Sequence, residues 1–177
     1  LELSDQAKVK HMSIGESIRK NKVAIIAGGL IVVVLLLVGT FLISNKIAPI
    51  STGWWGATNT SDGIAIRGYD PVAYHTEQVA KAGEARFTHH WQDATWRFSS
   101  AENLAAFQTN PAQYAPRYGG VCARAVLAGF TADANPEIWT LHDGKLYLFV
   151  DADPMTEWQT AAQSDGVAIG DQNWSER

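Results

Sequence analysis

The side chains best suited to binding or reacting with a ligand are one cysteine and four histidines that follow residue 70: Cys122, His75, His89, His90 and His142. A cysteine thiolate and imidazole nitrogens are good ligands for Cu(I) and Zn(II). Neighbouring side chains on a strand point to opposite faces, so His89 and His90 are poorly placed to share one ion. We therefore expect Cys122, His90 and His75 as the candidate metal ligands, with copper or zinc as the cofactor.

Cys122 also has a simpler interpretation. It is the only cysteine of the chain, so it has no partner for an internal disulfide. It stands near the start of an expected helix, where the helix dipole favours a thiolate. However, a lone cysteine is also a common small residue of a hydrophobic core, and each histidine taken alone suits a hydrogen-bonded structural role. Both interpretations stay open at this point.

Other polar motifs have structural explanations that compete with functional ones. Asp70 precedes a proline, which is typical of a carboxylate that caps a turn. Gly119-Gly120 could present backbone amides to an anion, although a purely steric requirement for glycine is the simpler explanation. The GxSxG, P-loop, HExxH and CxxCH patterns are not found in the sequence, and we expect no catalytic residues and no enzyme activity.

The N-terminal part of the chain predicts a membrane anchor. Residues 23–43 are 21 uncharged, mostly apolar residues, which is enough for a helix to span a bilayer. This run is longer than the apolar region of a signal peptide. Five basic residues precede it, which predicts a cytoplasmic segment at 1–22 and an exported remainder. Residues 1–11 precede a plausible start at Met12 and have the character of a cloning remnant.

The exported part is acidic and rich in aromatic residues. Residues 47–177 contain 8 Lys plus Arg and 15 Asp plus Glu, a net charge of −7, and all seven tryptophans. Such a surface repels phosphate backbones, so we expect no nucleic-acid partner. The expected location is a bacterial inner membrane, with one span in the lipid bilayer and a periplasmic domain.

The expected fold is α+β, with β-hairpins packed against short helices. Residues 44–63 are rich in Ser, Thr and Gly and predict a linker, in which Trp54 and Trp55 either lie at the bilayer interface or cover the base of the domain. The globular domain is expected at 64–177. Its hairpins turn at Gln92-Asp93 and Asp143-Gly144, and a capping box at Ser99–Glu102 predicts a helix start. Further helices are expected after Gly119, at 153–163 and around Trp174.

Several spaced motifs resemble YHS-domain proteins: GYDPVAY at 68–74, FSSAENLAAF at 98–107, NPAQYAPRYGGVCARAV at 110–126 and DGKLYLF at 143–149. The similarity runs from about Ile64 to Trp174. It implies metal handling or docking, because such domains accompany copper-transporting ATPases and some hydroxylases. The first functional hypothesis is therefore a membrane-anchored binding module that handles a metal such as copper at the outer face. The alternative is a non-catalytic accessory subunit that docks on a larger membrane complex through residues 23–43.

Overall fold

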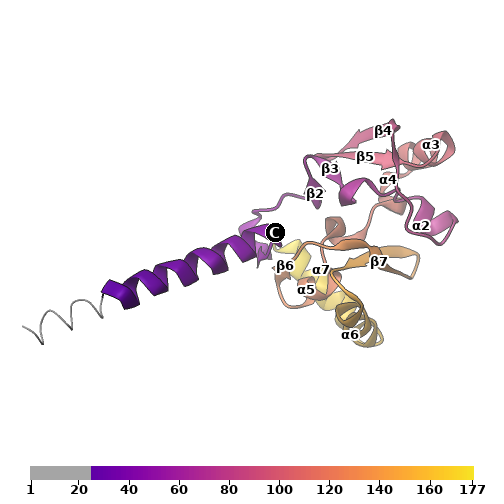
Figure 1. The fold of residues 1–177 in the computed structure, drawn as a ribbon. Helices are drawn as coiled ribbons and strands as arrows, with labels where there is room; N and C mark the ends of the chain where they lie inside the picture. The colour runs from indigo at the N-terminus through magenta and orange to yellow at the C-terminus, as the bar shows by residue number, and fades with distance from the viewer. Residues whose placement is uncertain (1–24) are drawn as a thin grey trace, which may run out of the picture. The chain divides into compact units, whose positions relative to one another are not determined.

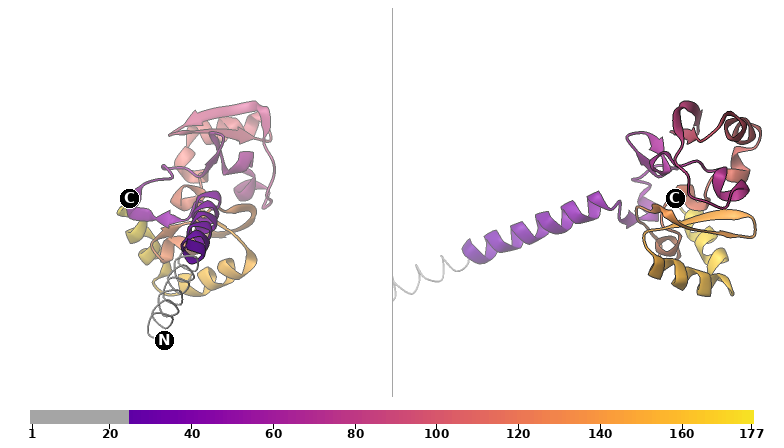
Figure 2. Two further views of the ribbon diagram at one scale, coloured as in Figure 1. Left: turned by 60° about the vertical axis from the view of Figure 1, so that its left-hand side comes forward. Right: turned by 45° about the vertical axis from the view of Figure 1, so that its right-hand side comes forward.

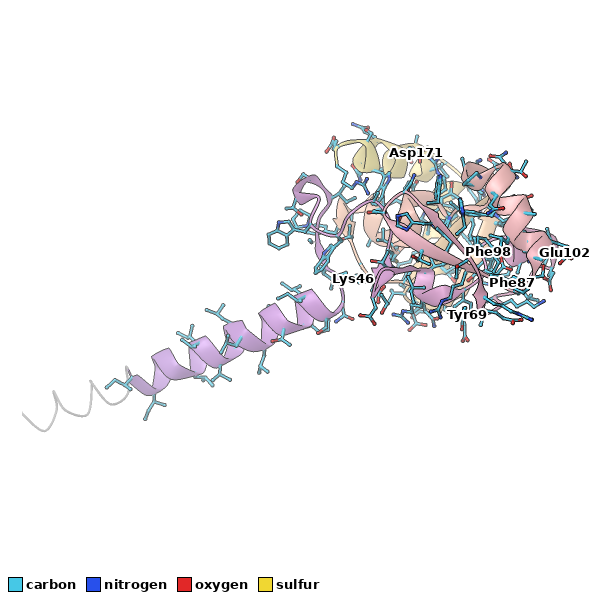
Figure 3. The ribbon with its side chains drawn as sticks, turned by 90° about the horizontal axis from the view of Figure 1, so that it is seen from above. Lys46, Tyr69, Phe87, Phe98, Glu102 and Asp171 are labelled. Atoms are coloured by element: carbon cyan, nitrogen blue, oxygen red, sulfur yellow. The ribbon has the colours of Figure 1, made fainter. Side chains whose placement is uncertain are left out.

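The computed structural model describes residues 25–177, which divide after Ser44 into an N-terminal unit and a folded domain, Asn45–Arg177. In the first unit, Ile25–Ser44 forms one helix that is long and apolar enough to cross a membrane, by length and composition (Figure 1). Its apolar side chains project outward along its whole length and are exposed (Figure 3). The expected cytoplasmic segment 1–22 and the first two residues of the expected span 23–43 lie outside the described residues.

The domain combines helices and strands, which confirms the α+β class. Two long hairpins and three longer helices are separated by short elements. In chain order the elements are β1 (Ala48–Pro49), η1 (Ile50–Thr52), β2 (Thr60–Ser61), β3 (Ile64–Ala65), η2 (Ile66–Gly68), α2 (Ala73–Thr76), β4 (Glu84–Trp91), β5 (Ala94–Phe98), α3 (Ala101–Thr109), α4 (Pro111–Tyr114), η3 (Arg117–Gly120), α5 (Ala123–Leu127), β6 (Phe130–Thr131), β7 (Asn135–His142), β8 (Lys145–Phe149), α6 (Ala152–Ala162) and α7 (Gly166–Ser175).

The strands form three small sheets that belong to two lobes of the domain. One lobe contains the sheet of order β2-β3-β5-β4 together with α2, α3 and α4. The other contains the β7-β8 and β1-β6 pairs and the helices α5, α6 and α7 (Figures 1 and 2). Both long hairpins turn where the sequence predicts, at Gln92-Asp93 and at Asp143-Gly144.

Each lobe has its own hydrophobic core, and strand β8 joins the two. The side chains of Leu146 and Leu148 belong to the first core, with Trp96, Phe98 and Phe107. The alternate residues Tyr147 and Phe149 belong to the second core. Successive side chains of a strand point to opposite faces, so the buried residues 146–149 of β8 supply both cores. The other members of the second core include Ile50, Tyr118, Val121, Cys122, Val126 and Trp158.

Residues 45–63 differ from the expected linker, because they are folded into the domain. Strand β1 pairs with β6, placing Pro49 opposite Phe130, and Ala48 and Ile50 are buried. Further on, β2 pairs with β3. Serine, threonine and glycine are typical of loops, but apolar residues at 47, 48 and 50 are enough to fix this segment against the second core.

Two local predictions also differ from the structure. The capping serine of α3 is Ser100, whose hydroxyl accepts a hydrogen bond from the Asn103 amide at 3.1 Å, and not Ser99. Gly119-Gly120 does not open a helix but lies in η3, and α5 begins later with Cys122 as its N-cap. Both errors are shifts of one to three residues along the chain, and they leave the elements themselves in place.

Candidate ligand-binding site

Cys122 lies in the second core with only 2% of its surface exposed. Its amide donates to the Ala132 carbonyl at 2.9 Å, and its backbone forms a bridge with Leu148 of β8. The helix that it caps, α5, has five residues, which is too short for a strong dipole. These surroundings are those of a small core residue.

The two candidate histidine ligands lie on other elements. His75 is in α2, half-buried, with its ring edge-on to Tyr114 at 5.5 Å between centroids. His90 is exposed on β4 opposite Thr95, while its neighbour His89 faces the other way, towards Phe107. Within residues 25–177 no group of three or more His, Cys, Asp or Glu side chains is placed to hold a metal ion. The described donors thus do not fit a Cu or Zn centre built on Cys122.

Asp70 of the GYDPVAY segment is fully buried, and its carboxylate is saturated with hydrogen bonds. One oxygen accepts from the Val72 amide at 2.9 Å, as expected for a turn cap. The other accepts from the Ser99 amide and hydroxyl at 2.8 and 2.7 Å, and from the Asn103 side chain at 2.7 Å. Asp70 therefore fastens the turn before α2 to the end of β5 and the start of α3, which is a structural task.

A cleft of about 270 Å³ lies between the two lobes and is lined by aromatic and charged side chains. We call it the tryptophan cleft, after Trp91 and Trp96 of the first lobe and Trp174 of α7. Pockets for small molecules are often found where two lobes or domains meet, and they combine apolar walls with a few polar groups. The polar groups here include Arg117, Tyr118, Asp171 and Arg177.

The hairpin β4-β5 and helix α7 supply the aromatic walls. The Trp96 indole donates to the Trp91 carbonyl at 3.2 Å, and the two rings lie 5.9 Å apart. On the other side the Trp174 ring lies 5.9 Å from Tyr118, and the Arg177 guanidinium stacks over Trp174 at 4.6 Å. These hydrogen bonds and ring contacts give the walls of the cleft a defined shape.

The charged groups of the cleft centre on Asp171, which Figure 3 labels on α7. Its carboxylate accepts hydrogen bonds from the Arg117 guanidinium and, at 3.1 Å, from the Tyr118 hydroxyl. Burial and the neighbouring carboxylate raise the pKa of Tyr118, so its hydroxyl keeps its proton. Partial burial opposes the charge of Arg117, but the hydrogen bond and charge of Asp171 raise its pKa overall. Arg117 is therefore a fixed cation at this site.

The backbone at Arg117–Gly120 is shaped to build this cleft. Tyr118 has a φ of 57°, a conformation that is unusual for an aromatic residue and that tends to occur at binding sites. Gly119 has a φ of +61°, and a Cβ there would lie 2.0 Å from the Ala57 carbonyl oxygen. The glycine pair is thus required by a close approach between chain segments, which agrees with the steric interpretation of the sequence.

Comparisons with known proteins do not assign a family or a function to this site. No family model, no curated protein and no solved structure matches the chain. The resemblance to YHS-domain proteins consequently stays a prediction.

Sequence reasoning did not find the tryptophan cleft, because its residues are scattered from Ala57 to Arg177 and follow no fixed spacing. The one available signal was composition, since tryptophan is abundant in this acidic domain.

Proposed function

We propose that this protein is a membrane-anchored binding protein whose ligand occupies the tryptophan cleft. The observation that carries the proposal is the convergence of Trp91, Trp174 and two arginines on one cleft of a domain with a net charge of −6. The Ile25–Ser44 helix holds the protein in the inner membrane, and the domain Asn45–Arg177 lies on the periplasmic side. The excess of basic residues before the helix supports this orientation.

The chemistry of the cleft favours a small planar aromatic molecule that carries a carboxylate. Indole rings offer flat apolar faces for stacking, and guanidinium groups hydrogen-bond carboxylates in a fixed planar geometry. At about 270 Å³ the space is close to the lower end of the ligand-pocket range, about 300 Å³. That volume suits a molecule of one or two rings and is too small for a folded peptide segment.

The proposal keeps the binding-module class expected from the YHS resemblance but gives it a different ligand. Among residues 25–177, Cys122 belongs to no group of three or more His, Cys, Asp or Glu side chains that could hold a metal ion. The ionisable groups of the cleft hold one another in place: Asp171 accepts from both Arg117 and Tyr118. This arrangement suits binding, and the proposal assigns no catalytic step to the protein.

Binding is tested with 1-naphthoate and its neutral analogue 1-naphthamide, added to the full chain in lipid nanodiscs, with empty discs as the reference for partitioning. We expect 1-naphthoate to quench tryptophan fluorescence saturably and to bind at least about tenfold more tightly than 1-naphthamide, since one charge-assisted hydrogen bond contributes about 1.5 kcal/mol or more.

The Arg177→Gln variant should bind 1-naphthoate about tenfold more weakly. Arg124→Gln is the matched control, because Arg124 pairs with Glu157 outside the cleft. Equal affinities for both probes, or equal losses in both variants, would contradict the proposal and leave the accessory-subunit hypothesis ahead.

The anchor and its orientation are tested separately. A reporter that is active only after export, fused after Arg177, should be active in cells, and the protein should remain in the membrane fraction after alkaline washing. Release of the domain into the periplasm would show that the apolar helix is a cleaved signal sequence. An inactive reporter on a stably expressed fusion would reverse the orientation.

A further inference from the structure

The part of the domain that follows the apolar helix is uncharged and carries an exposed tryptophan. Between Ile47 and Ser61 the sequence contains no charged residue, although the domain as a whole has a net charge of −6. Trp54 stands in this segment with 74% of its surface exposed. The neighbouring Trp55 is half-buried, and its indole nitrogen is enclosed by the protein. The two tryptophans therefore have different environments, and Trp54 is much the more exposed of the two.

Phe130 is joined to this uncharged segment by backbone pairing. It is 44% exposed, and it lies opposite Pro49 in the β1-β6 ladder. The next residue, Thr131, donates its hydroxyl to the Lys46 carbonyl at 2.8 Å, and the Asp133 amide donates to the Asn45 carbonyl at 2.7 Å. Phe130 is thus fixed near Asn45 and Lys46, the first two residues of the domain.

The chain leaves almost no free length between the apolar helix and this surface. The helix ends at Ser44, and Asn45 already takes part in the hydrogen bonding of the domain. An extended chain spans at most about 3.6 Å per residue, so Pro49 lies within about 18 Å of the helix end in any orientation of the two units. A domain anchored in this way stays at the membrane surface.

The charge nearest the helix is neutralised inside the domain. The Lys46 ammonium bonds the Asn59 side chain at 2.6 Å and lies 3.6 Å from the Asp133 carboxylate. Hydrogen bonds from Arg67 and Asn59 and the charge of Lys46 together outweigh burial and lower the pKa of Asp133, which therefore remains charged. Lys46 is consequently not a free cation for anionic lipid headgroups.

We infer that Trp54 and Phe130 lie in the headgroup layer of the membrane that holds the Ile25–Ser44 helix. Tryptophan is favoured at that depth, because its ring is apolar and its N–H can still reach water or headgroup oxygens. The inference rests on the proposed anchor and goes beyond it, since it identifies the membrane-facing surface of the domain and decides between the two roles expected for Trp54 and Trp55. The contact is made by aromatic rings, so it should not depend on anionic lipid.

The test uses the full chain in vesicles of zwitterionic lipid with bromine on the upper acyl carbons, which quenches nearby tryptophans. We expect Trp54→Phe to remove at least half of the lipid-dependent quenching, and the matched variant Trp139→Phe to leave it nearly unchanged. Adding Phe130→Trp to Trp54→Phe should restore quenching. Replacing a fifth of the lipid with an anionic one should change none of these results.

Flotation of each variant with its vesicles separates the two claims. A Trp54→Phe protein that floats but shows wild-type quenching would overturn the membrane contact and leave the anchor in place. Protein that does not float would overturn the anchor, and the inference with it.

Discussion

Asp70 and Asp171 belong to the same small domain, but their carboxylates differ in burial and in the number of hydrogen bonds that they accept. Asp70 is fully buried, and hydrogen bonds from Val72, Ser99 and Asn103 occupy both of its oxygens. Asp171 lies in an open cleft with its side chain 42% exposed, beside one arginine and one tyrosine. The first arrangement leaves no position for a ligand atom, whereas the second leaves Arg117 within reach of solvent.

The difference shows where a polar residue contributes to stability and where it can contribute to binding. A buried carboxylate is tolerated only when its hydrogen bonds are complete, so each of its partners is needed for folding. A half-exposed ion pair adds little to stability, because water screens it. The two members of such a pair can therefore give up their contact with each other and bind a ligand instead. The comparison predicts large stability effects at Asp70 and mainly binding effects at Asp171.

The largest expected effect is that of Asp70→Ala. It removes the acceptor of several buried donors at once, and we expect it to lower the free energy of unfolding by about 3–5 kcal/mol. Urea unfolding of the full chain in nanodiscs, followed by tryptophan fluorescence, measures the change. A loss below about 1 kcal/mol would mean that water replaces the missing carboxylate and that Asp70 does not fasten the first lobe.

The next effect in size is that of Ser99→Ala, which removes one donor to the Asp70 carboxylate. We expect a loss of about 1–2 kcal/mol. A double-mutant cycle with Asp70→Asn should give a coupling energy of at least about 0.5 kcal/mol, because the two side chains are in contact. Additive losses would show that the Ser99 hydroxyl acts independently of Asp70.

The sequence predicted the elements of the fold better than it predicted the site. Hairpin turns such as Asp143-Gly144 have local signals, and large apolar residues of the two hairpins and of α3, such as Trp96, Phe98, Phe107 and Leu146, are buried. The sequence did not show that Tyr118 belongs to a second core, because the division into two cores depends on which face of β8 meets which lobe. The cleft depends on contacts such as Arg117 with Asp171, 54 residues apart, for which a single sequence gives no signal.

A smaller effect is expected from a change at His75, a half-buried residue of the first lobe. Burial lowers the pKa of His75 below its usual value of 6.5, and its Nε2 atom is buried without a hydrogen-bond partner among the described residues. The unfolded chain therefore binds a proton more readily than the folded one as the pH falls below about 6.5, and stability decreases in that range. We expect His75→Gln to flatten this part of the stability–pH curve, and the exposed-site control His90→Gln to leave it unchanged. An unchanged slope in His75→Gln would contradict the neutral, buried imidazole.

The proposal that the tryptophan cleft binds a carboxylate is tested by the affinity of Asp171→Asn for 1-naphthoate, measured by isothermal titration of the full chain in nanodiscs. If the ligand's carboxylate is bound by Arg117, which Asp171 now neutralises, removing that charge should strengthen binding about fivefold, or about 1 kcal/mol. The free energy of unfolding should change by less than about 1 kcal/mol, as for other half-exposed ion pairs. An unchanged or weaker affinity in a protein of wild-type stability would contradict the account of the tryptophan cleft as an anion-binding site.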